Sequence, residues 1–180
     1  MDKRLLVVSN SSPIMNLAII GQLHLIQELF GEIIIPKEVW AELIIEGKGK
    51  PGTNEIEKAK WIKVVKVKND SLVKTLTKDL DVGESAAIAL AIERKANLLL
   101  LDETDARNLA EFYNLTKTGV LGILMRAKKR RLIKQIKPML EKLRIQAHFW
   151  IKPDLYDAIL SEMGETPLLL KRNFFIPLPL

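Results

Sequence analysis

The chain has 180 residues, of which 48% are hydrophobic, and it carries a formal net charge of +6. This length and composition predict one folded domain that buries a core without disulfides. Cysteine is absent and only two histidines are present, which excludes a disulfide framework, a cysteine nucleophile and a histidine-rich metal site. No apolar run reaches the roughly 18 residues that a membrane span needs, so we expect no membrane association and a cytoplasmic protein.

The first part of the chain, up to a glycine-rich loop at residues 47–52, alternates apolar strands with helices. The strands are continuous in apolar residues, as strands covered on both faces are. In chain order we predict a strand at 4–9, a helix capped by Ser11 or Ser12 and ending at Gly21, a helix at 23–30, a strand at 33–35 and a helix from Pro36.

The second part continues the same alternation. A strand at residues 61–67 alternates apolar residues with lysines, which indicates one solvated face and therefore an edge strand or a short connecting strand. The other strands are expected at 96–101 and 115–118. The helices are expected at 54–60, from Asn69 or Asp70 to 78, at 83–93, from Thr104 or Asp105 to 113, from Gly119, at 134–144 and at 153–163.

Strands separated by helices predict an α/β fold with a mostly parallel central sheet. We expect one domain at residues 1–164 and a separate apolar tail with three prolines at residues 165–180. Such a tail is predicted to dock on its own domain or on a neighbouring subunit, and a disordered tail is the alternative.

Four polar side chains stand where apolar elements meet loops: Asn10, Glu42, Glu84 and Asp102. In an open α/β sheet, ligands bind outside the carboxyl ends of the strands, where Asn10 and Asp102 are expected. Carboxylates gathered there need a neutralising cation, and oxygen ligands suit Mg²⁺ or Mn²⁺. Asp105 follows Asp102 by three residues, so either of them could enter the site while the other caps a helix. Taken singly, each acid could also be a helix cap or a solvated surface group.

A basic stretch lies in the interval between Glu111 and Glu141, which contains no acidic residue. It is a candidate phosphate-contacting surface, and the alternative is a solvated helix end whose cations offset the helix dipole. As candidates for RNA binding we select Arg126, Lys128, Lys129, Arg130, Arg131 and Lys134.

Several segments of the chain, spanning roughly residues 4–145, resemble the PIN domain in the same order. They are VVSNSSPIMNLAIIGQLHLI, FGEIIIPKEVWAELI, GESAAIALAIERKANLLLLDETDARNLAEFYNL and TGVLGILMRAKKRRLI. More closely, they are similar to uncharacterised prokaryotic PIN-like proteins related to VapC toxins. The resemblance implies a three-layer α/β/α fold and RNA cleavage that depends on Mg²⁺ or Mn²⁺.

The resemblance also implies a site. The four acidic positions of the family fall on Asn10, Glu42, Glu84 and Asp102, with Asp105 close to the last, and the small hydroxyl residue falls on Ser12. Asn10 departs from the pattern, because an amide can ligate a cation but carries no charge. We therefore expect either a ribonuclease, such as the toxin of a toxin–antitoxin pair with a cognate antitoxin, or a weakly active or inactive module that binds RNA or a protein. A homodimer assembled through the apolar tail is a further expectation.

Overall fold

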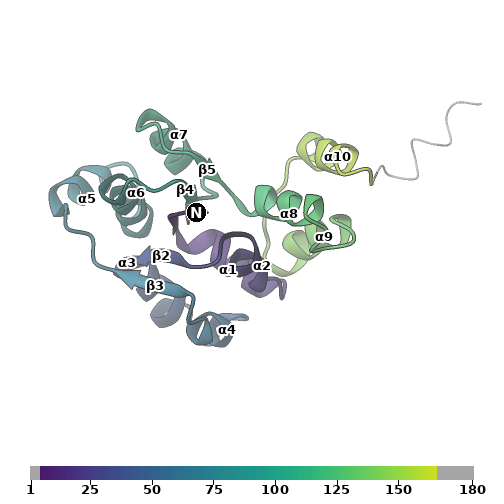
Figure 1. The fold of residues 1–180 in the computed structure, drawn as a ribbon, viewed down its shortest axis with the longest axis horizontal. Helices are drawn as coiled ribbons and strands as arrows, with labels where there is room; N and C mark the ends of the chain where they lie inside the picture. The colour runs from purple at the N-terminus through teal and green to yellow at the C-terminus, as the bar shows by residue number, and fades with distance from the viewer. Residues whose placement is uncertain (1–4, 166–180) are drawn as a thin grey trace, which may run out of the picture.

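The computed structural model describes residues 5–165, which form a five-stranded sheet in which every pair of neighbouring strands is parallel (Figure 1). The strand order is β3-β2-β1-β4-β5, so the first strand lies in the middle. The strands are β1 (Val7–Ser9), β2 (Ile33–Pro36), β3 (Ile62–Val65), β4 (Leu98–Leu100) and β5 (Lys117–Thr118).

Helices cover both faces of the sheet, which confirms the α/β prediction and gives three layers. They are α1 (Ser11–Ile19), α2 (His24–Phe30), α3 (Lys37–Trp40), the π-helix η1 (Ala41–Glu46), α4 (Thr53–Lys58), α5 (Asp70–Leu76), α6 (Val82–Arg94), α7 (Thr104–Phe112), α8 (Val120–Lys129), α9 (Lys137–Gln146) and α10 (Pro153–Glu162). In Figure 1, α5, α6 and α7 lie on one side of the sheet and α1, α2, α8 and α9 on the other.

The burial of each strand follows its sequence. The central strands β1 and β4 are fully buried and contain only apolar residues apart from Ser9, and Ser9 pairs with Leu100 across them. The lysine-bearing β3 is an edge strand with two exposed residues, as its alternating pattern predicted. On one face of the sheet, α6 is buried from Gly83 to Ala91 because its alanines allow close packing against the strands.

Two predicted helix caps are wrong. The N-cap of α1 is Asn10 and not Ser11 or Ser12, and the N-cap of α7 is Glu103 and not Thr104 or Asp105. In both cases the N-cap lies one or two residues before the residue that was predicted to cap the helix. Neither Asn10 nor Glu103 uses its side chain to accept a capping hydrogen bond, so the side chain of Asn10 stays available for another role.

The helix after Pro36 changes its winding part-way. After α3 it continues as the π-helix η1, which carries Glu42 in its first turn. A π-helical turn inserts an extra residue and turns the following side chains relative to an α-helix, and such turns occur often at functional sites. The regular periodicity of the sequence predicted one continuous α-helix here.

No helix in residues 5–165 is long and apolar enough to cross a membrane. The proposed tail lies outside the described residues, apart from Glu165.

Candidate active site

Asn10 and Asp102 meet at the carboxyl edge of the sheet because they follow the neighbouring parallel strands β1 and β4. The backbone N–H of Asn10 donates to the carbonyl of Leu100 at 3.0 Å, which extends the pairing of the two strands by one step. The topology therefore brings together two residues that are far apart in the sequence, as their positions after buried strands predicted.

Hydrogen bonds from two helices, α1 and α8, hold the carboxylate of Asp102. The backbone N–H of Val120, at the start of α8, donates to Oδ1 at 2.7 Å. On the other oxygen, Oδ2, the hydroxyl of Ser12 and the amide of Asn16 donate at 3.4 Å each. Gly119 packs so closely that a Cβ there would overlap Oδ1 of Asp102. The orientation of this carboxylate is therefore fixed by its surroundings.

Burial raises the pKa of Asp102 to about 6, and the neighbouring Glu103 adds to the effect. The hydrogen bonds from Val120, Asn16 and Ser12 act in the opposite direction, because each of them favours the charged form. The raised pKa means that the cost of burying the charged carboxylate exceeds the stabilisation that its hydrogen bonds supply. A carboxylate in this state favours binding of a proton or of an external cation.

Glu84 lies in the first turn of α6 and is only 6% exposed. It forms a capping box with Asp81: the backbone N–H of Glu84 donates to Asp81 Oδ1 at 2.7 Å, and the backbone N–H of Asp81 donates to Glu84 Oε2 at 3.3 Å. Burial raises the pKa of Glu84 to about 7, with further increases from the charges of Asp81, Glu103 and Glu42. The carboxylates of this region are thus close enough to repel one another.

Glu42 projects from η1 toward the start of α6, where a Cβ on Gly83 would overlap its carboxylate. Burial raises the pKa of Glu42, and the charges of Asp81 and Glu46 raise it further, while hydrogen bonding from Ser11 lowers it. This carboxylate lines a cavity together with the following residues: Ser11, Ser12, Met15, Asn16, Leu43, Glu46, Lys50 and Asp81. Because Ser12 and Asn16 also contact Asp102, they connect the Glu42 cavity to the end of β4.

Asn10 is 2% exposed, and its Oδ1 has no hydrogen-bond partner. Its backbone is satisfied, since the carbonyl accepts from the hydroxyl of Ser9 at 2.8 Å and the N–H pairs with Leu100. Buried polar atoms without partners are rare in folded proteins, because the desolvation of such an atom is not offset. A ligand that binds this oxygen would remove that penalty.

The donor set fits a hard divalent cation in its chemistry, because it consists of carboxylate and amide oxygens only. The unpartnered Oδ1 of Asn10 and the raised pKa values of the three acids are both features of a site that lacks a positive charge. As the side chains stand, however, residues 5–165 contain no group of three or more His, Cys, Asp or Glu arranged to hold a metal ion.

Comparison with protein families identifies the fold. The model of the PIN-domain family DUF3368 matches residues 6–165, which is most of the chain. The chain belongs to this PIN-domain family. No curated protein matches it. PIN domains are commonly metal-dependent nucleases.

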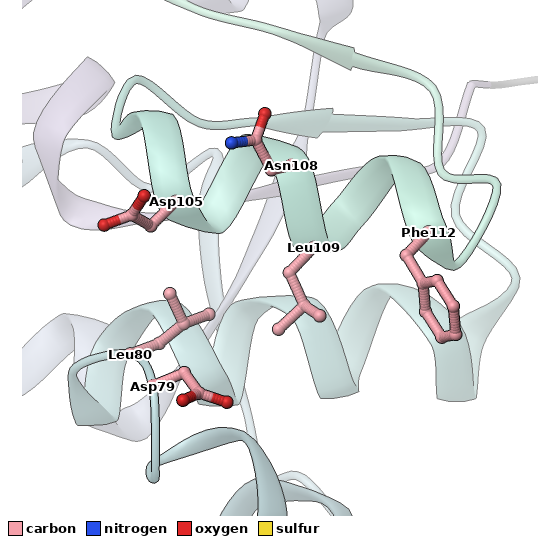
Figure 2. A pocket seen from close by; sticks show the side chains of 6 residues that line it. All are labelled: Asp79, Leu80, Asp105, Asn108, Leu109 and Phe112. Carbon is pink, nitrogen blue, oxygen red and sulfur yellow. The ribbon is translucent and has the colours of Figure 1, made fainter.

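The structure of this PIN domain places Asp105 away from the other acids. Asp105 lies in the first turn of α7 and lines a separate cavity with Asp79 and Leu80, which precede α6 (Figure 2). Asn108, Leu109 and Phe112 line the rest of that cavity. Asp105 lies three positions after Asp102, inside α7, and it lines neither the cavity of Glu42 nor that of Asp102, so the geometry offers no support for a shared ion.

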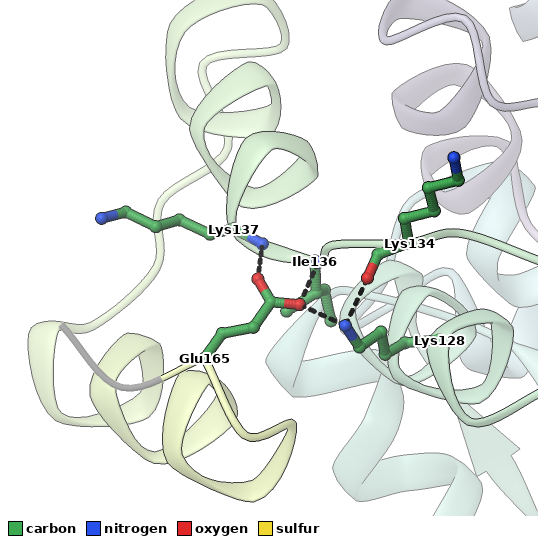
Figure 3. Close-up of polar contacts among 5 residues, drawn as sticks. All are labelled: Lys128, Lys134, Ile136, Lys137 and Glu165. Carbon is green, nitrogen blue, oxygen red and sulfur yellow. Dashed lines mark hydrogen bonds and ion pairs between the residues drawn. The ribbon is translucent and has the colours of Figure 1, made fainter. Parts of the chain in front are cut away.

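The basic stretch is partly neutralised by acids near the end of the described chain. Lys128 pairs with Glu165 at 2.7 Å and also donates to the carbonyl of Lys134 (Figure 3). Glu165 in turn accepts from the backbone N–H groups of Ile136 and Lys137 at 2.7 and 3.0 Å. The exposed Lys129 pairs with Glu162 at 2.6 Å. These two lysines therefore fasten the end of α10 and are less available for a nucleic acid than the sequence suggested.

The remaining members of the basic stretch lie in the last turn of α8 and beyond it, at the end of this helix that is opposite to Asp102. The guanidinium of Arg126 lies 5.5 Å from the ring centroid of Phe30, which ends α2 just before β2 begins. Because α8 starts beside Asp102 and runs back along the sheet, its last turn reaches the amino ends of the strands. Exposed Arg130, Arg131 and Lys134 follow that turn, so this surface does not adjoin the candidate site.

Three residues of the site region were missed from the sequence. Asn16 lies one helical turn after Ser12, and this i, i+4 spacing was the available signal that both could contact one group. Asp81 stands three residues before Glu84, which is the spacing of a capping box. Glu103 had no such signal, because its effect on the pKa of Glu84 depends on the tertiary arrangement.

Proposed function

We propose that this PIN domain is a ribonuclease that depends on Mg²⁺ or Mn²⁺ and acts at the carboxyl edge of its sheet. The observation that carries the proposal is the buried, unpartnered Oδ1 of Asn10, at the same edge as three carboxylates with raised pKa values. Asn10, Glu42, Glu84 and Asp102 would hold the ion. When bound, the ion supplies positive charge that binds the phosphate and offsets the charge that develops on its oxygens.

The protein residues would contribute by holding the ligand oxygens in fixed orientations and by supplying their negative charge. The N–H of Val120, together with Ser12 and Asn16, keeps the Asp102 carboxylate in one orientation, so little conformational freedom is lost on binding. Glu84 is oriented by its capping box with Asp81. Asn10 contributes an oxygen without a charge, which lowers the affinity for the cation relative to a site with a fourth carboxylate.

A cleavage assay tests this function. The full chain is incubated with a structured RNA and Mn²⁺, and the wild type is compared with Asp102→Asn and with Asn10→Asp. We expect Asp102→Asn to abolish cleavage and Asn10→Asp to preserve or increase it. Unchanged cleavage by Asp102→Asn would refute the site assignment. Asn108→Asp, an exposed change in the separate cavity of α7, controls for the added charge.

A second candidate is a PIN module that binds RNA or a protein without cleaving. It is favoured by the absence, within residues 5–165, of a group of three acids arranged to hold a metal. This candidate requires RNA binding that weakens with salt, no turnover, and no cation binding at millimolar Mn²⁺. Isothermal titration with Mn²⁺ separates the two, because only the nuclease requires a binding isotherm that Asp102→Asn removes.

The finer assignment, a toxin component with a cognate antitoxin and a homodimeric assembly, is part of the same proposal and rests on the PIN resemblance. Expression in a bacterial host tests the first part, since a toxin arrests growth and the Asp102→Asn variant does not. Light scattering on the full chain and on a chain that ends at Gly164 tests the expected role of the tail in dimerisation. An unchanged mass after truncation would remove the tail from the interface.

A further inference from the structure

Besides the cavity of Glu42, a groove lies next to Asp102. It has a volume of about 560 Å³ and is bounded by α7, α8, α10 and the loop that joins α9 to α10. Asp102 is part of its lining, so this groove adjoins the candidate site directly. The residues of the groove that matter for its chemistry are Arg107, Lys117, Phe149, Trp150 and Lys152.

Three cations line the groove, together with the carboxylates of Asp102 and Glu162. Arg107 donates from Nη1 to the carbonyl of Leu101 at 2.8 Å, which holds the guanidinium beside Asp102 and leaves other N–H groups to donate. Lys117 pairs with the exposed Glu111 at 3.0 Å. Lys152 is exposed and forms no ion pair with any of residues 5–165. Arg107 and Lys152 are therefore free to contact an anion.

An exposed aromatic side chain also lines the groove, two residues before Lys152. Trp150 is 76% exposed, although its neighbours in the chain are anchored: Ile151 is buried, and the backbone N–H of Phe149 donates to the carbonyl of Leu143. The loop is thus held in place while the indole faces solvent. A fixed, solvent-exposed aromatic ring next to cations is the combination that single-stranded nucleic acids bind, through base stacking and phosphate contacts.

We propose that this groove binds a single-stranded nucleic-acid segment, with a base stacked on Trp150 and phosphates on Arg107 and Lys152. A duplex does not fit the same features, because its bases are already stacked internally and the groove has the size of a small-ligand pocket. The inference deepens the proposed function: a strand in the groove would place its next phosphate toward Asp102. RNA and DNA share the chemistry of base and phosphate, so the choice between them is left to experiment.

Binding without cleavage is the direct test. The full chain, in EDTA, is titrated into a labelled single-stranded RNA 12-mer, the DNA of the same sequence and an RNA duplex, with fluorescence anisotropy as the readout. Trp150→Ala is compared with Trp150→Phe and with Phe112→Ala, a control that removes an equally exposed ring outside the groove. Lys152→Ala is compared with Lys134→Ala, which removes a lysine from the basic stretch.

We expect the wild type to bind single strands more tightly than the duplex, and Trp150→Ala to weaken this binding roughly 5- to 100-fold. Trp150→Phe should retain most of the affinity, and Phe112→Ala all of it. Lys152→Ala should reduce the slope of log affinity against log salt by about 0.7, the value for one phosphate on a single strand. Stronger binding of RNA than of DNA would identify RNA as the occupant.

Equal affinity of Trp150→Ala and the wild type, a preference for the duplex, or no binding at all would overturn the groove assignment. The proposed function is judged separately by cleavage with Mn²⁺. If the chain cleaves RNA and Trp150→Ala does not change its affinity for single strands, the proposed function is supported and the groove assignment is refuted. If Trp150→Ala weakens binding but the chain does not cleave RNA, the groove assignment is supported and the nuclease function is refuted.

Discussion

Val120 and Asp102 are joined by a hydrogen bond of 2.7 Å from the backbone N–H of Val120 to Oδ1 of Asp102. This bond ties the first turn of α8 to the end of β4, eighteen residues earlier in the chain. It places a carboxylate at the amino end of a helix, where the exposed N–H groups and the helix dipole favour negative charge. The pKa of Asp102 is raised even so, because burial outweighs the bond.

Replacement of Gly119 by alanine should disturb this carboxylate. The added Cβ would overlap Oδ1 of Asp102, and we expect a loss of about 1–3 kcal/mol in the free energy of unfolding together with weaker Mn²⁺ binding. Chemical denaturation and isothermal titration measure the two effects. Gly122→Ala is the matched control, since its Cβ would meet only the rotatable hydroxyl of Thr118. If both variants bind Mn²⁺ like the wild type, Asp102 does not depend on this packing.

The change Asn10→Asp should destabilise the metal-free protein and strengthen its binding of divalent cations. Asn10 is 2% exposed and its Oδ1 lacks a partner, so a charge placed there is desolvated and uncompensated until a cation binds. We expect a lower melting temperature in EDTA and at least about a tenfold gain in Mn²⁺ affinity, which corresponds to roughly 1.4 kcal/mol. Thermal scans with and without Mn²⁺ measure both, and Asn108→Asp should show neither effect. A cation affinity that does not rise would count against Asn10 as a ligand.

Stability of the metal-free protein should fall as the pH rises through the raised pKa values of two acids. The folded-state pKa is about 6 for Asp102 and about 7 for Glu84, against ordinary values of 3.8 and 4.5. The folded protein therefore holds protons that the unfolded chain has released, and the corresponding stability is complete below pH 4 and lost as the pH approaches 7. Melting temperatures in EDTA across this range measure the decline.

Two variants isolate the contribution of each acid to this pH dependence. Asp102→Asn should flatten the stability profile between about pH 4 and 6, and Glu84→Gln should flatten it up to about pH 7. Mn²⁺ should reverse the decline in the wild type, because the cation replaces the protons. Profiles of the two variants that run parallel to the wild-type profile would show that the acids are not desolvated in the folded state.

Loss of the Glu165 charge should loosen the attachment of α10. Burial opposes ionisation of Glu165, but hydrogen bonds from Lys128 and from the backbone of Lys137 and Ile136 lower its pKa overall. We expect Glu165→Gln to reduce the free energy of unfolding by about 1–3 kcal/mol. Glu162→Gln, which affects only the exposed pair with Lys129, should change it by less than about 1 kcal/mol. Urea denaturation compares the two, and equal effects would contradict the anchoring role of Glu165.

The fold was predicted well from the sequence because the apolar pattern of each strand reflects how deeply that strand is buried in the sheet. The continuous apolar runs at β1 and β4 predicted strands buried on both faces, and the alternating pattern of β3 predicted one solvated face, in an edge strand or a short connecting strand. The convergence of Asn10 and Asp102 followed from the same logic, since parallel strands share one carboxyl edge. Local periodicity gave no signal for the π-helical turn at Glu42, which depends on packing against its neighbours.

The position of the basic stretch could not be predicted from composition. Its charges follow each other in the sequence, but their distance from the acids depends on the direction of α8, which carries Arg126 to the far edge of the sheet beside Phe30. Ion pairs such as Lys128 with Glu165 join residues thirty-seven positions apart and leave no local pattern. Trp150 also escaped notice, because its exposure is a property of the folded loop.

The four proposed donors come from four separate parts of the fold: the end of β1, η1, the start of α6 and the end of β4. A chain still emerging from the ribosome has no complete donor set until Asp102 has been made and β4 has joined β1. The contacts of Asp102 with Val120 delay completion until α8 has formed as well. If the domain cleaves RNA, a growing chain is therefore expected to be inactive until β4 and α8 have folded, so shorter unfinished chains do not cleave RNA.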